Sequence, residues 1–330
     1  MKADGRRTVV IVGILSLIAA FLISLFIGNG TVGTGDLLQV LFGSSYSKSA
    51  YIILTRIRIP RTLAALLCGA ALSSSGLVLQ TVLDNPLASP GIIGINSGAG
   101  LFVLIAGIIF PFSAAARQLF SFAGAVVAVA SVYLICKIAG FSKMTLVLTG
   151  VAISSLFTAG TNTITTFYPN AITDKAAFNL GGLSSVSLQG VLTALPCIVI
   201  CLVIIFAKQG QIELLLLGDE TASGLGVNPE HTRKVSLLIS ALLAGSAVSL
   251  CGLLGFVGLI VPNVIRRIRC EGLLYRLILC VIYGSLFLII CDVLSRLIFY
   301  PYEIPVGLIL SALGAPFFIW ILISRRKAVR

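Results

Sequence analysis

The sequence predicts an all-α, polytopic integral membrane protein. Of its 330 residues, 58% are hydrophobic and only 10% are charged, with a mean hydropathy of +1.11. Soluble domains carry about 25% charged residues, so this chain cannot bury its apolar surface in a fold surrounded by water. Its apolar segments are continuous for about 20 residues, the length at which a helix crosses a hydrocarbon core. They lack the period-two alternation of membrane β-barrels, which favours helices.

Apolar runs separated by charged residues, glycine and proline predict about ten transmembrane helices in a single domain, 1–330. The runs lie near 9–28, 62–83, 92–110, 118–137, 145–167, 190–207, 231–252, 255–266, 273–297 and 305–323. The first run follows three basic residues, but it is longer than the apolar part of a secretory signal and lacks an Ala-x-Ala cleavage site. We therefore expect it to be the first membrane helix. The eighth run is short and contains Pro262, which can break a helix.

The positions of lysine and arginine predict the orientation. With ten spans, both termini lie on one side, and sixteen of the 23 Lys and Arg residues fall on that side. Basic loops remain on the cytoplasmic side of a membrane. Both termini are therefore predicted to be cytoplasmic, and the net charge of +12 is assigned to loops rather than to nucleic-acid binding.

The middle of each predicted span lacks Asp, Glu, Lys, Arg and His. Buried charges inside a membrane mark proton relays and ion-coupled carriers, so their absence disfavours a proton-driven carrier. The single histidine, His231, lies in a connection, and no hydrolase motif occurs, so no catalytic residue is predicted. The eight cysteines form no C-x-x-C pair, and no metal site is predicted.

Two spans carry polar or small residues on one face. In the second span, Gly69, Ser73, Gly76 and Gln80 share a face, which predicts close helix packing. The fifth span is rich in hydroxyl groups, and helical spacing places several of them on one face. These hydroxyls could line an aqueous translocation path, or they could bond back to carbonyls one turn earlier and hold helices together. The candidate path residues are Gly150, Ser154, Thr158, Thr161, Asn162 and Thr165.

Four blocks of the chain resemble one family of transport proteins. They are RIPRTLAALLCGAALSSSGLVLQTVLDNPLASPGIIGINSGAG (58–100), LLLLGDETASGLGV (214–227), GLLGFVGLIVPNVIRR (252–267) and DVLSRLIFYPYEIPVGLILSALGAPFFIWIL (292–322). In this order and at these spacings they are similar to the FecCD-type, BtuC-like permeases, the membrane subunits of ABC importers for iron–siderophores, haem and cobalamin. The resemblance implies a BtuC-like bundle of ten helices in the bacterial cytoplasmic membrane.

The same resemblance implies the partners. They are a second permease subunit of the same or a related chain, two ABC ATPase subunits that bind ATP and Mg²⁺, and an extracytoplasmic solute-binding protein. This chain itself is expected to bind no cofactor, and it has no Gly-Lys dipeptide with which to build a phosphate-binding loop. A ferric siderophore is the expected cargo, with haem and cobalamin as the next candidates. The alternative is an ATPase-independent carrier or channel for a polar solute.

A segment near 211–228 resembles the coupling helix that docks into a groove on the ATPase. It is too polar to span a membrane and is predicted to be cytoplasmic. The alternative is an amphipathic helix on the membrane surface, but its acidic residues make an anionic leaflet an unfavourable partner. The candidate coupling residues are Leu217, Gly218, Asp219, Glu220, Ala222, Leu225 and Gly226.

Three arginines match family positions that face outward and pair with glutamates of the solute-binding protein: Arg58, Arg61 and Arg296. The planar guanidinium suits such docking because it can hold a carboxylate through two hydrogen bonds. For Arg296 the alternative is an ion pair with Asp292, one helical turn earlier.

The loop containing Asn85, Pro86 and Leu87 resembles a cytoplasmic gate of the family, and Ser142 lies in the second loop expected there. Pro86 would end the second span, and the Asn85 side chain could cap exposed backbone. The chain departs from the family pattern at two places. Asn263 follows Pro262 where the family usually has histidine, and a tryptophan common after the fifth span is absent from 178–185.

Overall fold

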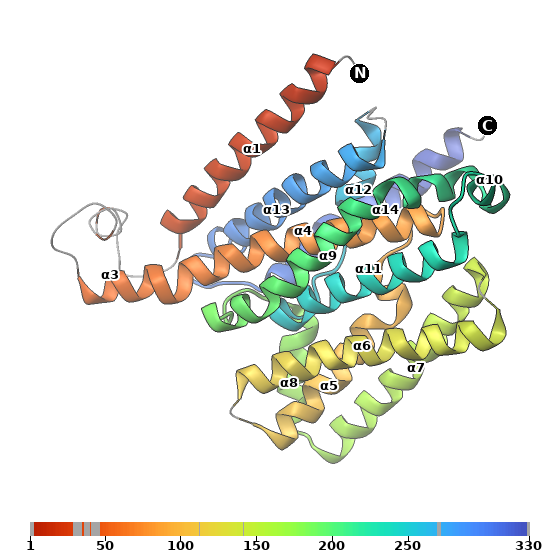
Figure 1. Cartoon of the computed structure of the whole chain (residues 1–330). Coiled ribbons are helices and arrows are strands. Elements are labelled where there is room, and N and C mark those ends of the chain that lie inside the picture. The colour runs from red at the N-terminus through yellow and green to blue at the C-terminus, as the bar shows by residue number, and fades with distance from the viewer. Residues whose placement is uncertain are drawn as a thin grey trace.

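The computed structural model describes residues 3–28, 35, 40, 47–111, 113–140, 142–268 and 272–328, and throughout these residues the regular elements are helices (Figure 1). The first half contains α1 (Ala3–Phe26), α3 (Lys48–Ile52), η1 (Ile53–Arg58), α4 (Ile59–Val82), η2 (Pro90–Ile93), α5 (Ile95–Ile109), α6 (Ala114–Ala139) and α7 (Lys143–Phe167). The second half contains α8 (Ala171–Leu180), α9 (Leu188–Leu214), η3 (Leu215–Leu217), α10 (Asp219–Gly224), α11 (Pro229–Cys251), α12 (Val257–Arg267), α13 (Leu273–Leu297) and α14 (Val306–Ala328).

The bundle has two ends, which we name by what they carry. The arginine end, where α4 begins and α13 ends, carries Arg58, Arg61 and Arg296. The α10 end carries α10 (Figure 1). The helices α1 and α13 run in the same direction, because Tyr275 Oη donates to the Arg6 carbonyl (2.6 Å) at their beginnings while Arg296 contacts Ser24 at their ends. α1 begins and α14 ends toward the α10 end.

The helix α4 is the centre of the bundle and packs against α13, α11, α12 and α9. Its small residues permit this close packing. A Cβ atom placed on Gly69 would overlap the Gly284 carbonyl on α13, and one placed on Gly76 would overlap the Gly258 backbone on α12. The packing face predicted for the second span is therefore confirmed. By contrast, α7 lies at the edge, together with α5, α6 and α8, and leaves most of its surface exposed.

Among the described residues, seven helices are long and apolar enough to cross a membrane. They lie in Gly5–Phe26, Lys48–Val82, Ala114–Ala139, Met144–Phe167, Leu188–Leu217, Pro229–Cys251 and Leu273–Leu297. The other three predicted spans fall on helices whose apolar parts are shorter than those of the seven. These are Ile95–Ile109, Val257–Arg267 and Val306–Ile321. The helical membrane class is thus confirmed, while the count of ten remains a prediction.

Two details differ from the expectations. Pro262 lies inside α12 without ending it, although proline removes a helical hydrogen bond. The helix α8 was not predicted, although Pro169 and Asn170 precede it and Gly181 follows it, which are ordinary signals for the start and end of a helix.

Candidate functional site

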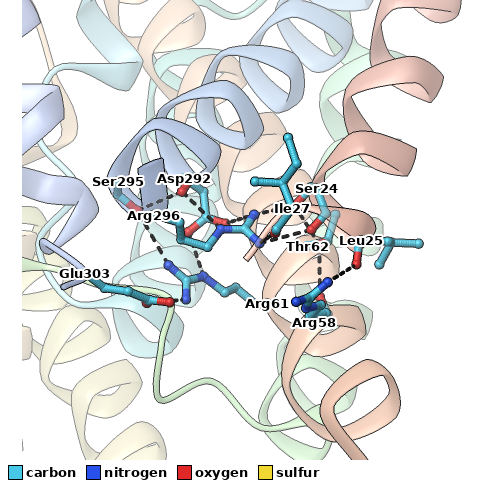
Figure 2. A network of polar contacts seen from close by, with 10 residues as sticks. All are labelled: Ser24, Leu25, Ile27, Arg58, Arg61, Thr62, Asp292, Ser295, Arg296 and Glu303. Atoms are coloured by element: carbon cyan, nitrogen blue, oxygen red, sulfur yellow. Dashed lines mark hydrogen bonds and ion pairs between the residues drawn. The ribbon is translucent and has the colours of Figure 1, made fainter. Parts of the chain in front are cut away.

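The arginine end contains a buried network of ions centred on Asp292 (Figure 2). The Asp292 carboxylate accepts hydrogen bonds from two guanidinium groups, from Arg61 Nε on one oxygen and from Arg296 Nη2 on the other, both at 2.8 Å. Arg61 Nη1 also donates to Glu303 Oε2 (2.7 Å). Because Arg61 lies on α4 and Asp292 on α13, this carboxylate joins the two helices at one end of the bundle.

The same network caps the last turn of α1. Arg58 Nη1 donates to the carbonyl oxygens of Leu25 and Phe26, each at 2.9 Å. Arg296 Nη1 donates to the Ser24 carbonyl (3.0 Å), and its Nη2 donates to Ser24 Oγ (2.7 Å). The last carbonyls of a helix have no partner within it and carry partial negative charge. Two arginines therefore complete the end of α1.

The three arginines predicted to dock the solute-binding protein lie together, but their side chains are buried rather than exposed. The docking role itself stays a prediction. Arg58, Arg61 and Arg296 are 4%, 5% and 2% exposed, and Asp292 is fully buried. The physical reason is that acidic groups and helix-end carbonyls of the same chain already satisfy the guanidinium groups. The ion pair of Arg296 with Asp292, the alternative raised by the sequence, is present.

Glu303 is the accessible member of the network. Its side chain is 31% exposed, and it lines a cavity of about 780 Å³ together with Arg61. The cavity lies between α6, α8, α9, α11 and the chain segment before α14, and a second ion pair, Arg117 with Asp174 at 3.0 Å, lies on its wall. The Arg61–Glu303 pair therefore borders an open space, whereas the Asp292 pairs are sealed.

At the α10 end, the coupling segment forms a short helix held against α11. Arg233 donates two hydrogen bonds to the Asp219 carboxylate, at 2.8 and 3.0 Å. Gly218 and Gly226 bracket α10 with φ angles of +95° and +81°, a region that favours glycine. These glycines thus serve the turns on either side of α10.

The remaining coupling candidates divide into a buried and an exposed group. Ala222 is buried and anchors α10, whereas Glu220 is exposed. Leu217 and Leu225 are each 58% exposed. Two exposed leucines beside an exposed carboxylate, on a connection between spans, form a small apolar surface suited to contact with another protein.

The predicted gate loop follows α4 at the α10 end. The Asn85 side chain accepts a hydrogen bond from the Leu87 amide (2.9 Å), so the expected capping by Asn85 is confirmed. The Pro86 carbonyl accepts a hydrogen bond from Asn263 Nδ2 (2.9 Å). Ser142 is the N-cap residue of α7, and its hydroxyl accepts a hydrogen bond from the Thr145 amide (3.0 Å). A gating role for these residues remains a prediction.

The candidate path residues are only partly on one surface. Ser154, Thr158 and Asn162 line a shallow hollow of about 460 Å³ on α7. Gly150 is buried beneath η2, where the Cβ of a residue replacing Gly94 would lie 3.5 Å from its carbonyl oxygen. Thr161 and Thr165 do not line this hollow, and the Thr165 hydroxyl donates to the Thr161 carbonyl (3.1 Å).

Both readings of the hydroxyl-rich face therefore have support. The Thr158 hydroxyl lines the hollow and also donates to the Ser154 carbonyl one turn earlier (2.7 Å). Within the described part of the chain, no three side chains of His, Cys, Asp or Glu are grouped so as to hold a metal ion.

Sequence reasoning missed three residues with clear roles. Glu303 completes the arginine network, Arg233 holds α10 through Asp219, and Asn263 contacts the loop that contains Pro86. A charge count could have indicated Glu303, because three arginines at one end of a membrane protein need more than one carboxylate. The Asn263 contact lies 177 residues away in the sequence, and no local pattern indicates it.

Comparisons with known proteins agree with one another. The sequence profile of the FecCD transport family matches residues 16–324. The Fe(3+)-citrate import system permease protein YfmD of Bacillus subtilis (strain 168) is 35% identical over 320 residues, which cover 97% of this chain and 96% of that protein. The iron(3+)-hydroxamate import system permease protein FhuG of the same organism is 32% identical over 339 residues, covering 98% and 99%.

Among solved structures, a metal-chelate type ABC transporter in an inward-facing conformation is similar to this chain with a TM-score of 0.83. The two are 26% identical, and the match covers 96% of this chain and 99% of that chain. The similarity therefore extends over the whole bundle, including both of its ends.

We expect Asp292→Asn to destabilise the bundle strongly. Removing the shared negative charge leaves two buried guanidinium groups without their common partner, a change that typically costs about 3–5 kcal/mol. The measurement is the melting temperature of the purified protein in detergent, which should fall by several degrees. Glu230→Gln is the control, because its partner Lys234 forms an exposed pair one turn away on α11. Equal melting temperatures for the two variants would contradict the central position of Asp292.

Proposed function

We propose that this chain, which belongs to the FecCD transport family, carries a ferric siderophore or a related ferric chelate across the membrane. It is a permease subunit of an ABC importer, a multi-pass protein of the cytoplasmic membrane, and not itself an enzyme. The observation that carries the choice of cargo is that relatives similar over nearly the whole chain are named for ferric citrate and for iron(3+)-hydroxamate. Haem and cobalamin are the next candidates.

The proposed topology is ten transmembrane helices with both termini and the α10 end in the cytoplasm. The helices α5, α12 and α14 complete the count as shorter spans that lie beside longer neighbours. Arg6, Arg266 and Arg267 lie at the α10 end, as expected for the cytoplasmic side. The arginine end would then face outward, toward the solute-binding protein.

The proposed assembly contains a second permease subunit, two ABC ATPase subunits and an extracytoplasmic solute-binding protein. ATP and Mg²⁺ would bind on the ATPases, and this chain would bind no cofactor. The exposed, hydroxyl-bearing α7 would face the second permease subunit across the path, with Ser154, Thr158 and Asn162 toward the cargo. Hydroxyl and amide groups suit a polar chelate because they can replace part of its hydration.

The mechanism follows from the positions of the two ends. Closure of the ATPases on ATP would move the coupling segments, and the docked binding protein would bias the opposite end. Each partner shifts the population between inward-open and outward-open states only by binding one of them more tightly. Residues 84–88 and the start of α7 would form the cytoplasmic gate.

The function is tested by uptake into proteoliposomes that contain the permease, its ATPases and its binding protein. We expect uptake of ⁵⁵Fe supplied as ferric citrate or as a ferric hydroxamate to require ATP and to survive collapse of the proton gradient. Haem and cobalamin serve as competing cargoes in the same vesicles. Uptake without ATPase subunits, driven by the proton gradient, would instead indicate a secondary carrier, and selective uptake of cobalamin would overturn the cargo.

We expect the double substitution Leu217→Ser and Leu225→Ser to weaken ATPase binding at least tenfold. Burying a leucine side chain contributes about 1.5–3 kcal/mol, and about 1.4 kcal/mol corresponds to tenfold in affinity. The dissociation constant is measured between the purified ATPase and the permease in nanodiscs. Leu274→Ser, an exposed leucine at the start of α13 on the same end, is the matched control. Unchanged affinity in the double variant would mean that the ATPase contacts another surface.

Docking of the binding protein on Arg58, Arg61 and Arg296 stays a proposal, and burial constrains how it would occur. Among the described residues, the cavity is the open space that Arg61 borders, and Glu303 already holds Arg61 there. A carboxylate from outside would therefore approach Arg61 through the cavity. We propose that the binding protein's carboxylate replaces Glu303 on Arg61, while Asp292 keeps Arg61 and Arg296 in place. Reversing the charges of Arg58 and Arg61 would disrupt the fold itself, so Glu303 is the better probe.

Glu303→Gln is therefore expected to strengthen docking several-fold, because the competing negative charge is removed. The readout is the affinity of the binding protein for the permease in nanodiscs at low and high salt, since a pair bordering open space is screened by salt. Asp174→Asn, which removes the other carboxylate of the same cavity, is the control and should have little effect. Weaker docking in Glu303→Gln would mean that the arginines serve only the fold.

A further inference from the structure

Two amide side chains meet around Pro262 at the α10 end. Proline has no backbone N–H, so Pro262 leaves the carbonyl of Gly258, four residues earlier in α12, without its helical donor. Gln80 on α4 supplies that donor, with Nε2 3.1 Å from the Gly258 oxygen. This contact is possible because Gly76 and Gly258 bring the two helices into close approach. Gln80 therefore allows α12 to continue through its proline.

The second amide side chain belongs to Asn263, the residue after the proline. Its Nδ2 donates to the Leu259 carbonyl in its own helix (2.8 Å) and to the Pro86 carbonyl in the loop after α4 (2.9 Å). Asn263 is 8% exposed, so water competes little for these hydrogen bonds. Both hydrogens of the amide are thereby used, and the side chain joins α12 to the loop.

The loop is also held to Gln80 through the backbone. The Asn85 amide donates to the Gln80 carbonyl (3.0 Å), and the Ala88 amide donates to the Asn85 carbonyl (3.0 Å). The loop 84–88 is therefore attached on one side to α4 and on the other side to α12. We call Gln80 and Asn263, with these contacts, the amide clamp.

The clamp lies between the coupling segment and the loop. The element η3 of the coupling segment contacts α4, and Leu215 of η3 is buried in the core. On the far side, α12 contacts α14 through Arg267, whose guanidinium lies 3.9 Å from the centre of the Trp320 ring. A movement of α4 or α12 would therefore reach the loop through these side chains.

The clamp uses the nitrogen of the Gln80 amide but not its oxygen. The Gln80 Oε1 atom is buried and accepts no hydrogen bond from the described residues. A buried acceptor without a partner is unfavourable.

We propose that Asn263 is a positioning residue for transport, which holds the loop 84–88 to α12 so that the loop moves with that helix when the coupling segment is displaced. The inference rests on the proposed function of this loop as the cytoplasmic gate. In this proposal, α12 is the helix with which the gate loop moves.

The test follows the loop directly in the assembled importer. Leu87→Cys is introduced as a reporter, and its labelling by a membrane-impermeant maleimide is measured in proteoliposomes with the ATPases, with and without ATP and vanadate. Labelling of the same importer without the reporter is subtracted to account for the native cysteines. ATP hydrolysis and uptake of ⁵⁵Fe as ferric citrate are measured on the same preparations.

With Asn263 in place, labelling should differ between the two nucleotide conditions. In Asn263→Leu we expect labelling to become at least fivefold faster without nucleotide and to lose its dependence on ATP and vanadate. Uptake should fall at least fivefold, while basal ATP hydrolysis stays unchanged. Asn263→His, which keeps an N–H donor, should restore the nucleotide dependence.

Two further variants separate positioning from stability. In Asn263→Ser the hydroxyl can bond the Leu259 carbonyl but cannot reach Pro86, so it should behave like Asn263→Leu even if the leucine variant folds poorly. Ser75→Ala removes another buried hydrogen bond of α4, from Ser75 Oγ to the Ser240 carbonyl (2.6 Å), and should leave the labelling pattern unchanged.

Nucleotide-dependent labelling and normal uptake in Asn263→Leu and Asn263→Ser would overturn the positioning role of Asn263. The assignment of the loop as a gate would then still stand. Labelling that ignores nucleotide even with Asn263 present would instead overturn the assignment of the loop as a gate, and the clamp with it.

Discussion

The structure depends on one buried carboxylate, that of Asp292. It holds two guanidinium groups, from Arg61 and Arg296, at 2.8 Å each, and so joins α4 to α13 at the arginine end. Among the described residues, three arginines face two carboxylates there, and carbonyls at the end of α1 accept hydrogen bonds from Arg58 and Arg296. Buried ion pairs contribute little net stability compared with apolar packing, but losing one partner is costly. The network therefore specifies which helix ends meet.

This fixed end has consequences along α4. With its beginning held by ions and its middle pressed against α13 and α12 at glycines, α4 is a rigid central element. Near its end, Gln80 contacts α12 and the loop 84–88, and α4 also contacts η3, the element before α10. A displacement of α10 and η3 would therefore act on the loop 84–88 and on α12, which lie beside α4. The helix α7 lies away from this centre and is largely exposed.

For the three arginines, the role implied by their positions in the sequence differs from the surroundings of their side chains in the structure. Their positions in the sequence match a docking role, yet in this chain they are buried and paired. The two statements are compatible if Glu303, the one exposed carboxylate of the network, exchanges with a partner's carboxylate. Because the arginines are buried, docking would depend on Glu303, the acidic residue that pairs with Arg61.

The sequence by itself determined the membrane class, the approximate positions of the long helices and the packing face of α4, although α9 extends to Leu214, beyond the predicted end at 207. These features depend on hydropathy, glycine spacing and backbone conformation, which are local properties. Only the tertiary structure decided the partners of the buried polar groups. Arg61 meets Asp292 and Glu303 across 231 and 242 residues, and Gln80 completes the helix around Pro262 across 178 residues to Gly258. A buried charge or carbonyl must be satisfied, but which distant residue satisfies it depends on which helices pack together, and no local pattern contains that information.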